Sequence, residues 1–239
     1  MRLILFDQGP VIPNFGQGSK CETENHAFCW GWVRDHWSDT LQPALLQHIK
    51  LALIAVAIGF VLSFAAALVA YRYRRADQPI GLFSDFLYTI PSLALFQLLV
   101  PLTGLTVTTV EVALTSYTLL IMYRNILEGL RGVPPEVKES ARGMGLSRLQ
   151  TLVRVELPLA TPSIIAGVRI ATVSTISIAT VAAFVIPEGL GRPIFIGITQ
   201  DIFKTEIIAA GVLAILLALG ADAILVAVGR ALTPWRAAG

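Results

Sequence analysis

Residues 51–70 read LALIAVAIGFVLSFAAALVA, an apolar stretch of 20 residues that carries no charge. Lys50 stands directly before this stretch, and three arginines follow it within 72–75. A helix rises ~1.5 Å per residue, so about 20 apolar residues are enough to cross the hydrocarbon core of a bilayer. We therefore predict a transmembrane helix over 49–70 that ends at a basic cluster.

The composition of the whole chain also favours a membrane protein. The 239 residues are 55% hydrophobic and 14% charged, and the mean hydropathy is +0.71. Soluble domains carry about 25% charged residues, so a disordered chain is excluded and a single water-soluble domain is disfavoured. The net charge of +2 argues against a nucleic-acid partner, whose phosphates need a broad basic face.

Further apolar segments predict more spans. Residues 86–123 contain a single acid, Glu111, and are long enough for two spans that fold back at Thr103–Leu105. Two later apolar segments carry one intramembrane charge each. The prediction is an all-α, polytopic membrane protein with about five transmembrane helices, over 49–70, 84–104, 106–127, 163–186 and 207–229.

The basic residues predict the orientation of the chain, because loops rich in Lys and Arg stay in the cytoplasm. This bias places an N-terminal segment, 1–48, outside the cell membrane and a tail, 230–239, in the cytoplasm, with the transmembrane domain over 49–229. Six Lys and Arg residues fall on the outer side. Eleven fall on the cytoplasmic side: Arg72, Arg74, Arg75, Arg124, Arg131, Lys138, Arg142, Arg148, Arg154, Arg230 and Arg236.

The N-terminal segment contains both cysteines of the chain, Cys21 and Cys29. Its apolar stretch near the start is too short for the core of a signal peptide, so we expect the segment to remain attached. Outside the cell the two cysteines can form a short-loop disulfide or stay as free thiols. A zinc site that adds His26 and His36 is less favoured, because sparse extracellular cysteines seldom bind metal.

Residues 134–158 predict two short helices joined by a fixed turn. The Pro-Pro pair at 134–135 suits a helix start, and Gly145 suits a left-handed cap at the helix end. Ser147–Gln150 has the spacing of a capping box that opens the second helix, which Pro158 is expected to close.

The second of these helices is amphipathic, which suits docking on another surface. It can pack against another protein or lie on lipid headgroups that attract its basic residues. An apolar stripe of Leu146, Leu149, Leu152 and Val153 lies opposite Arg148, Thr151 and Arg154.

The spacing within this segment resembles the EAA signature of ABC importer permeases, E-A-A-x3-G-x9-I-x-L-P. It departs from that signature only by Ser140 for an alanine and Val155 for isoleucine. In that family this loop is the coupling helix, which enters a groove on a separate ATPase subunit. The resemblance assigns the coupling to Glu139, Ser140, Ala141, Gly145, Val155, Leu157 and Pro158, the last two at the re-entry into the membrane.

Other stretches resemble the osmoprotectant branch of that family, which imports glycine betaine, choline, carnitine or proline. The outer loop departs from the family pattern at Pro187, Glu188 and Pro193. A methionine-type or other amino-acid importer permease is the alternative. The stretches that resemble this branch are Trp30–Trp32, Leu45–His48, Tyr88–Ser92, Tyr123–Asn125, Gly129–Val133 and Gly189–Gly191.

The resemblance also implies a type I importer fold and its partners. These are ABC ATPase subunits, an extracytoplasmic binding protein and a second permease subunit, either identical or related. The chain has no GxxxxGK[ST] phosphate loop, so we expect no ATP hydrolysis of its own, no enzymatic activity and no cofactor. A secondary carrier and a membrane scaffold are the remaining alternatives, and the scarcity of ion-relay groups argues against the carrier.

Two intramembrane charges, Arg169 and Asp222, are expected at similar depths on the cytoplasmic side. They can pair, or each can extend to the interface. The pair fails if the small-residue row of the fourth span faces the fifth span, because Arg169 lies on the other side of that helix. We expect these small residues to serve in helix packing or in a permeation wall, and we name no substrate-binding residue. The rows are Ser163, Gly167, Ala171, Thr175, Ala179 and Ala183, and Ala210, Ala214 and Ala218.

Overall fold

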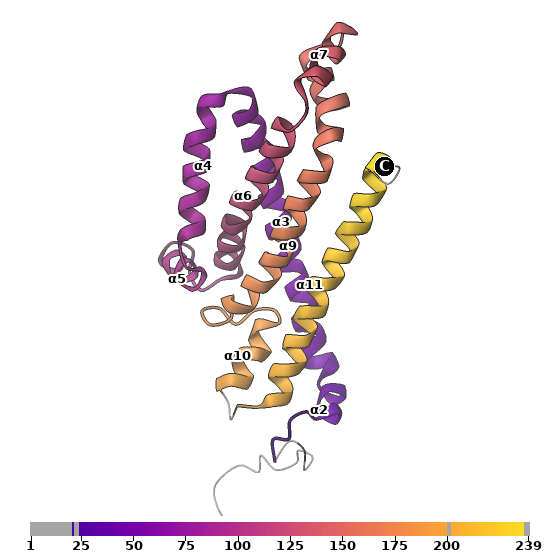
Figure 1. The fold of residues 1–239 in the computed structure, drawn as a ribbon. Helices are drawn as coiled ribbons and strands as arrows, with labels where there is room; N and C mark the ends of the chain where they lie inside the picture. Colours follow the sequence, from indigo (N-terminus) through magenta and orange to yellow (C-terminus); the bar gives the residue numbers. More distant parts are fainter. Residues whose placement is uncertain (1–20, 22–23, 200–201, 237–239) are drawn as a thin grey trace, which may run out of the picture.

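The computed structural model describes Cys21, residues 24–199 and residues 202–236. This part of the chain is helical and contains no strand (Figure 1), so the all-α prediction is confirmed. The elements are α2 (Trp30–Asp35), the π-helical turn η1 (Trp37–Leu41), α3 (Gln42–Arg72), α4 (Arg74–Thr89), α5 (Ser92–Thr103), α6 (Val107–Arg131), α7 (Pro135–Gly143), α8 (Arg148–Thr151), the π-helical turn η2 (Leu152–Glu156), α9 (Leu157–Ala182), α10 (Gly191–Thr199), α11 (Lys204–Leu232) and the 3₁₀ turn η3 (Pro234–Arg236).

Helix α6 lies at the centre of the bundle, packed along both α3 and α9. Helix α4 covers α3 and α6 on one side, and α11 packs on α9 on the other (Figure 1). One core surrounds Phe96 and Leu114 toward α10, and another surrounds Tyr123 and Ile126 toward α7. We call the two ends of the bundle the α10 end and the α7 end.

Within the described residues, three helical runs are long and apolar enough to cross a membrane: Trp37–Arg72, Arg148–Ala182 and α11. The bent pair α4 and α5 makes a fourth if it counts as one span. Helix α6 has 25 residues, enough to cross, but it buries threonines such as Thr109 and Thr118 against its neighbours. A central helix meets little lipid, so its sequence can be less apolar than that of the helices around it.

The second predicted span, over 84–104, is not a single helix. Helix α4 already begins at Arg74, and α4 and α5 meet at a bend of 101°. Ile90 is extended, with ψ at 126°, because the following Pro91 disfavours the helical conformation of its predecessor. The predicted turn after this segment is present, since α5 ends at Thr103 and Gly104 has φ of +76°.

Pro158 does not close the second helix of the 134–158 segment, so that prediction was wrong. Helix α8, the turn η2 and α9 form one run over Arg148–Ala182, 35 residues long. Proline lacks an N–H group, and its ring conflicts with the carbonyl four residues earlier in a regular helix. The π-helical turn that directly precedes Leu157 and Pro158 changes the hydrogen-bond register there, so the helix continues.

The N-terminal segment is described from Cys21 onward, apart from residues 22–23, so the prediction that all of 1–48 stays attached lies largely outside the described residues. A disulfide joins Cys21 to Cys29. It uses both sulfur atoms that the zinc alternative needs, and His36 stacks on the ring of Trp32 instead, with 4.6 Å between ring centroids.

Helix α2 is fixed to the start of α11. The backbone N–H of Cys29 donates to the hydroxyl of Thr205 at 2.9 Å. Trp32 packs edge-on against Phe203, with ring centroids 5.3 Å apart. Cys29 and Trp32 are both buried, so the segment before the first span belongs to the packed structure of the α10 end.

Candidate functional site: the coupling segment and the transmembrane helices

The local sequence closes helix α7 at both ends. Pro135 occupies its first turn, where the missing N–H costs nothing. Gly145 has φ of +85°, and its N–H donates to the carbonyl of Arg142 at 2.9 Å. The N–H of Leu146 donates to the carbonyl of Ala141 at 3.2 Å. These two bonds form a Schellman motif, so the predicted left-handed glycine cap is confirmed.

A capping box follows directly, as predicted. The Ser147 hydroxyl accepts the N–H of Gln150 at 3.3 Å, and the Gln150 side chain accepts the N–H of Ser147 at 2.8 Å. The box satisfies backbone donors at the start of α8 that the helix itself cannot pair. The turn between α7 and α8 is therefore defined by short-range bonds on both sides.

One face of α7 is held against the bundle. Ala141 is buried on this face. The ammonium group of Lys138 donates to the hydroxyl of Tyr71 at 3.0 Å and to the carbonyl of Leu130 at 3.3 Å. These bonds connect α7 to the ends of α3 and α6.

Other side chains of α7 and of the turn after it are exposed. Glu139 and Ser140 are exposed on α7, and Met144 at its C-terminal end is 73% exposed. A charged and apolar surface of this kind suits a protein partner. Of the predicted coupling residues, Ala141 thus faces inward, while Glu139, Ser140 and Gly145 remain accessible.

The C-terminal part of the predicted coupling motif lies in η2 and the first turn of α9. Val155 is partly buried within η2, and Leu157 packs against the core toward the α7 end. Pro158 is partly buried in the first turn of α9. The motif therefore does not form one cluster: its first part is the exposed helix and turn, and its second part joins that turn to a membrane-spanning run.

Behind α7 lies a hollow of about 760 Å³ between the ends of α3, α4 and α6 and the α8–η2 region. Its wall is strongly basic, which fits the positive charge expected on the cytoplasmic side. Glu156 is the acid on this wall. The basic residues are Arg72, Arg74, Arg131, Lys138, Arg142 and Arg148.

The two intramembrane charges meet. Arg169 donates from Nε and Nη2 to the two carboxylate oxygens of Asp222, at 2.8 and 2.9 Å. The small-residue row of α9 faces α6: a side chain at Gly167 would meet Asn125, and the Ser163 hydroxyl donates to the Asn125 carbonyl at 2.8 Å. Arg169 therefore points toward α11, which is why the pair can form, and the row serves helix packing.

At the α10 end, His48 makes structural contacts that the sequence did not indicate on chemical grounds. It is fully buried, and its Nε2 lies 3.0 Å from the carbonyl of Ile176. Its Nδ1 accepts the N–H of Leu190 at 3.1 Å, and Gln47 accepts the N–H of Gly189 at 2.9 Å. The first span thus holds the loop that follows α9. The only available signal was the match of Leu45–His48 to the family pattern.

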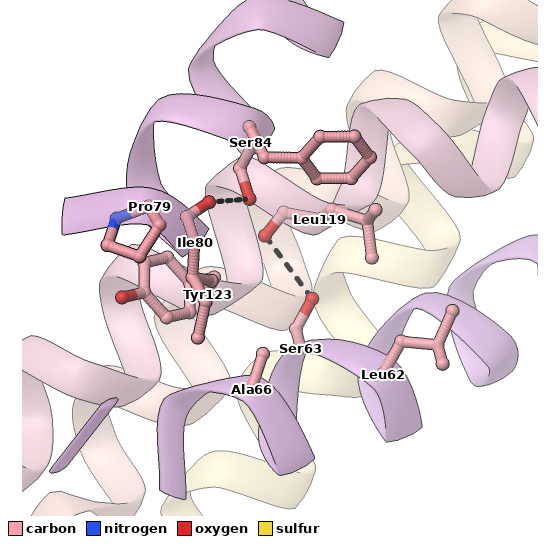
Figure 2. A pocket seen from close by; sticks show the side chains of 9 residues that line it. Leu62, Ser63, Ala66, Pro79, Ile80, Ser84, Leu119 and Tyr123 are labelled. Atoms are coloured by element: carbon pink, nitrogen blue, oxygen red, sulfur yellow. Dashed lines mark hydrogen bonds between the residues drawn. The ribbon is translucent and has the colours of Figure 1, made fainter. Parts of the chain in front are cut away.

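An apolar pocket of about 450 Å³ lies between α3, α4 and α6 (Figure 2). Figure 2 shows that its two serine hydroxyls point to backbone carbonyls: Ser63 donates to Leu119 at 3.2 Å and Ser84 donates to Ile80 at 2.9 Å. Both hydroxyl protons are used in these bonds, so the pocket presents a mainly apolar surface. Such a surface is a poor site for a charged solute.

The chain is similar to several permeases. The model of the family described as "Binding-protein-dependent transport system inner membrane component" matches residues 45–234. The choline transport system permease protein OpuBB of Bacillus subtilis is 36% identical over 79% of this chain and 86% of its own length. The osmoprotectant import permease protein OsmW of Salmonella typhimurium is 33% identical over 81% of this chain and 92% of its own length.

Solved structures agree on the fold. An inward-facing structure of the MetNI methionine ABC transporter superposes with a TM-score of 0.68, covering 80% of this chain and 95% of the other at 19% identity. A second match, an amino-acid ABC transporter, has a TM-score of 0.67 at 18% identity over 78% of this chain and 91% of the other. The helical bundle and the match over most of the chain lead to one conclusion: the protein belongs to the binding-protein-dependent inner membrane components, the integral membrane permeases of ABC importers.

Proposed function

We propose that this chain is the permease of an importer for choline, glycine betaine or carnitine. The supporting observation is the identity of 32–36% to several permeases named for these solutes, each matched over about four fifths of this chain. Permeases of this family work with ATPase and binding-protein partners, and ATP hydrolysis is done by the ATPase subunit. This permease is therefore not itself an enzyme.

The coupling role of the α7 end is part of the proposal. The exposed face with Glu139 and Ser140 contacts the ATPase, and the cap at Gly145 keeps that face in one position. ATP binding draws two ATPase subunits together, the coupling turns follow, and Val155, Leu157 and Pro158 pass the motion to α9. The accessibility of α7, its two local caps and its continuity with α9 through η2 support this mechanism.

The topology completes the proposal. The α7 end and residues 230–239 face the cytoplasm, residues 1–48 face outward, and an extracytoplasmic binding protein delivers the solute to the α10 end. A second permease subunit, identical or related, forms the other half of the pathway. The basic hollow behind α7 and the disulfide at the α10 end support this orientation, since disulfides persist in oxidising compartments.

Uptake by the assembled complex in proteoliposomes tests the function. Permease, ATPase and binding protein are combined, and labelled glycine betaine, choline, carnitine and methionine are offered with and without ATP. We expect ATP-dependent uptake of at least one quaternary ammonium solute and none of methionine. Uptake of methionine alone would establish the amino-acid alternative. Flux without ATP or partners would establish a carrier, and failure to move any solute would favour a scaffold.

A further inference from the structure

A small pocket at the α10 end, of about 240 Å³, lies where η1, the start of α3, α10 and the start of α11 meet. Pockets for drug-sized ligands span about 300–1,000 Å³, so this one suits a smaller molecule. Its wall is mixed polar and apolar, unlike the apolar pocket of Figure 2. The polar members of the wall are Asp39, Thr40, Gln47, Arg192 and Glu206.

Glu206 is the unusual member of this wall. Its side chain is buried, with only 8% of the residue exposed, and no hydrogen bond or ion pair within the described residues reaches its carboxylate. Glu206 lies in the first turn of α11, where a negative charge interacts favourably with the helix dipole. That interaction does not require the side chain to be buried, so it does not explain the burial of Glu206. The titratable neighbour is His36, which is stacked on Trp32. Its oxygens are not among the fully buried, unpartnered side-chain atoms of the described residues, so the carboxylate opens into the pocket, where a cation can offset the cost of its largely buried surroundings.

The charges around the pocket are of both signs and are not paired with one another. Asp39 is a second carboxylate on the wall, and Arg192 is a cation on α10. The ion pairs of the described residues involve none of Asp39, Arg192 and Glu206. A pocket with separate acidic and basic groups is complementary to a small molecule that carries both charges.

We propose that this pocket binds a small zwitterionic quaternary ammonium solute on its way into the permease. The ammonium end lies against Glu206 and Asp39, and the carboxylate end meets the guanidinium of Arg192. A solute with the ammonium group alone uses the acidic wall and leaves Arg192 without a partner. This assignment rests on the proposed function and adds a substrate-contacting site within the permease itself.

The test compares two solutes on the same complex. Uptake of glycine betaine, a zwitterion, and choline, a cation, is measured in proteoliposomes at saturating loaded binding protein. Arg192→Gln is expected to lower the ratio of glycine betaine to choline uptake at least fivefold. Glu206→Gln, nearly isosteric, is expected to lower the uptake of both solutes at least tenfold.

The matched controls are Arg34→Gln and Asp35→Asn, which remove one charge of each sign from exposed positions on α2 outside the pocket. Both are expected to keep the wild-type ratio of the two solutes. The thermal midpoint and the basal ATPase rate of each complex report whether a variant is folded and assembled. If Glu206→Gln fails this check, Asp39→Asn replaces it as the probe of the acidic wall, with a smaller loss of uptake for both solutes.

The outcomes separate this proposal from the proposed function. If the wild-type complex moves neither solute, the proposed function fails. If the wild-type complex is active but Arg192→Gln keeps the ratio and Glu206→Gln keeps the rate, only the pocket assignment fails. If Glu206→Gln weakens capture of the loaded binding protein and Arg192→Gln leaves the ratio unchanged, the pocket is a contact for that protein, which also overturns the assignment.

Discussion

The loops at the two ends of the bundle are shaped by different kinds of contact. At the α10 end, bonds join residues far apart in the sequence: His48 to Ile176 and Leu190, and Cys29 to Thr205. At the α7 end, the bonds that shape the coupling turn span only a few residues, such as those at Gly145 and Ser147. The loops of the α10 end are thus fixed by tertiary contacts, whereas the turn between α7 and α8 is formed by short-range bonds and is continuous with α9.

The largest effect is expected where the α10 end is most tightly packed. A side chain at Gly191 would place its Cβ in a clash with the Thr180 carbonyl oxygen, whereas Gly211 has open space around it. Gly191→Val should destabilise the protein by about 3 kcal/mol or more and remove most folded protein from the membrane fraction. Gly211→Val serves as the control and should stay near wild type. Equal yields and thermal midpoints for the two variants would contradict the rigid picture of the α10 end.

The second largest effect is expected from reduction of the disulfide between Cys21 and Cys29, which are eight residues apart in the sequence. Closing a loop of this size contributes about 2–3 kcal/mol, so reduction should lower the thermal midpoint of the protein in nanodiscs by several degrees. Cys21→Ser should show the same shift and no further response to reductant. A wild-type midpoint insensitive to reductant would mean that the other α2 contacts alone fix this end.

A smaller change in stability, but a clear change in function, is expected at Gly145. A methyl group there meets no atom, so the cost comes only from φ of +85° and is about 1–2 kcal/mol. Gly145→Ala should therefore lower the equilibrium constant for forming this turn about five- to thirtyfold and reduce ATP-driven uptake. Gly143→Ala, which adds a methyl group at ordinary φ, is the control. Full uptake and normal ATPase stimulation in Gly145→Ala would refute the coupling role.

The smallest effect is expected for the capping box. Ser147→Ala removes the acceptor for the Gln150 N–H and should cost about 1 kcal/mol. Hydrogen exchange at the start of α8 should become faster, while exchange at the α10 end stays unchanged. Ser147→Thr keeps a hydroxyl and should restore protection. A change at both ends would show that the two regions are less independent than the bonds indicate.

The sequence predicted features that depend on neighbouring residues. The glycine cap at Gly145 and the box at Ser147–Gln150 follow from short-range chemistry, and both are present. Long apolar runs likewise predicted the main helices. The relatively polar α6 is predicted as a span because residues 86–123 are long enough for two spans that fold back at Thr103–Leu105.

Features that depend on distant partners could not be predicted in the same way. The bond of His48 reaches a carbonyl 128 residues away, and nothing near His48 indicates it. Whether Arg169 meets Asp222 depends on which helix the small-residue row faces, and the contacts of Ser163 and Gly167 with Asn125 decide that. Pro91 breaks a helix and Pro158 does not, because the outcome depends on the register of the backbone around each proline.

The continuous helical run from Arg148 to Ala182 connects the turn at Gly145–Ser147 with the α10 end of the bundle. At ~1.5 Å per residue, its 35 residues extend about 52 Å, so a tilt of about 5° at one end shifts the other by about 4–5 Å. The ion pair between Arg169 and Asp222 lies within this run and connects α11 to it. A small tilt at the α8 end of this run therefore moves the two paired helices together as a rigid unit.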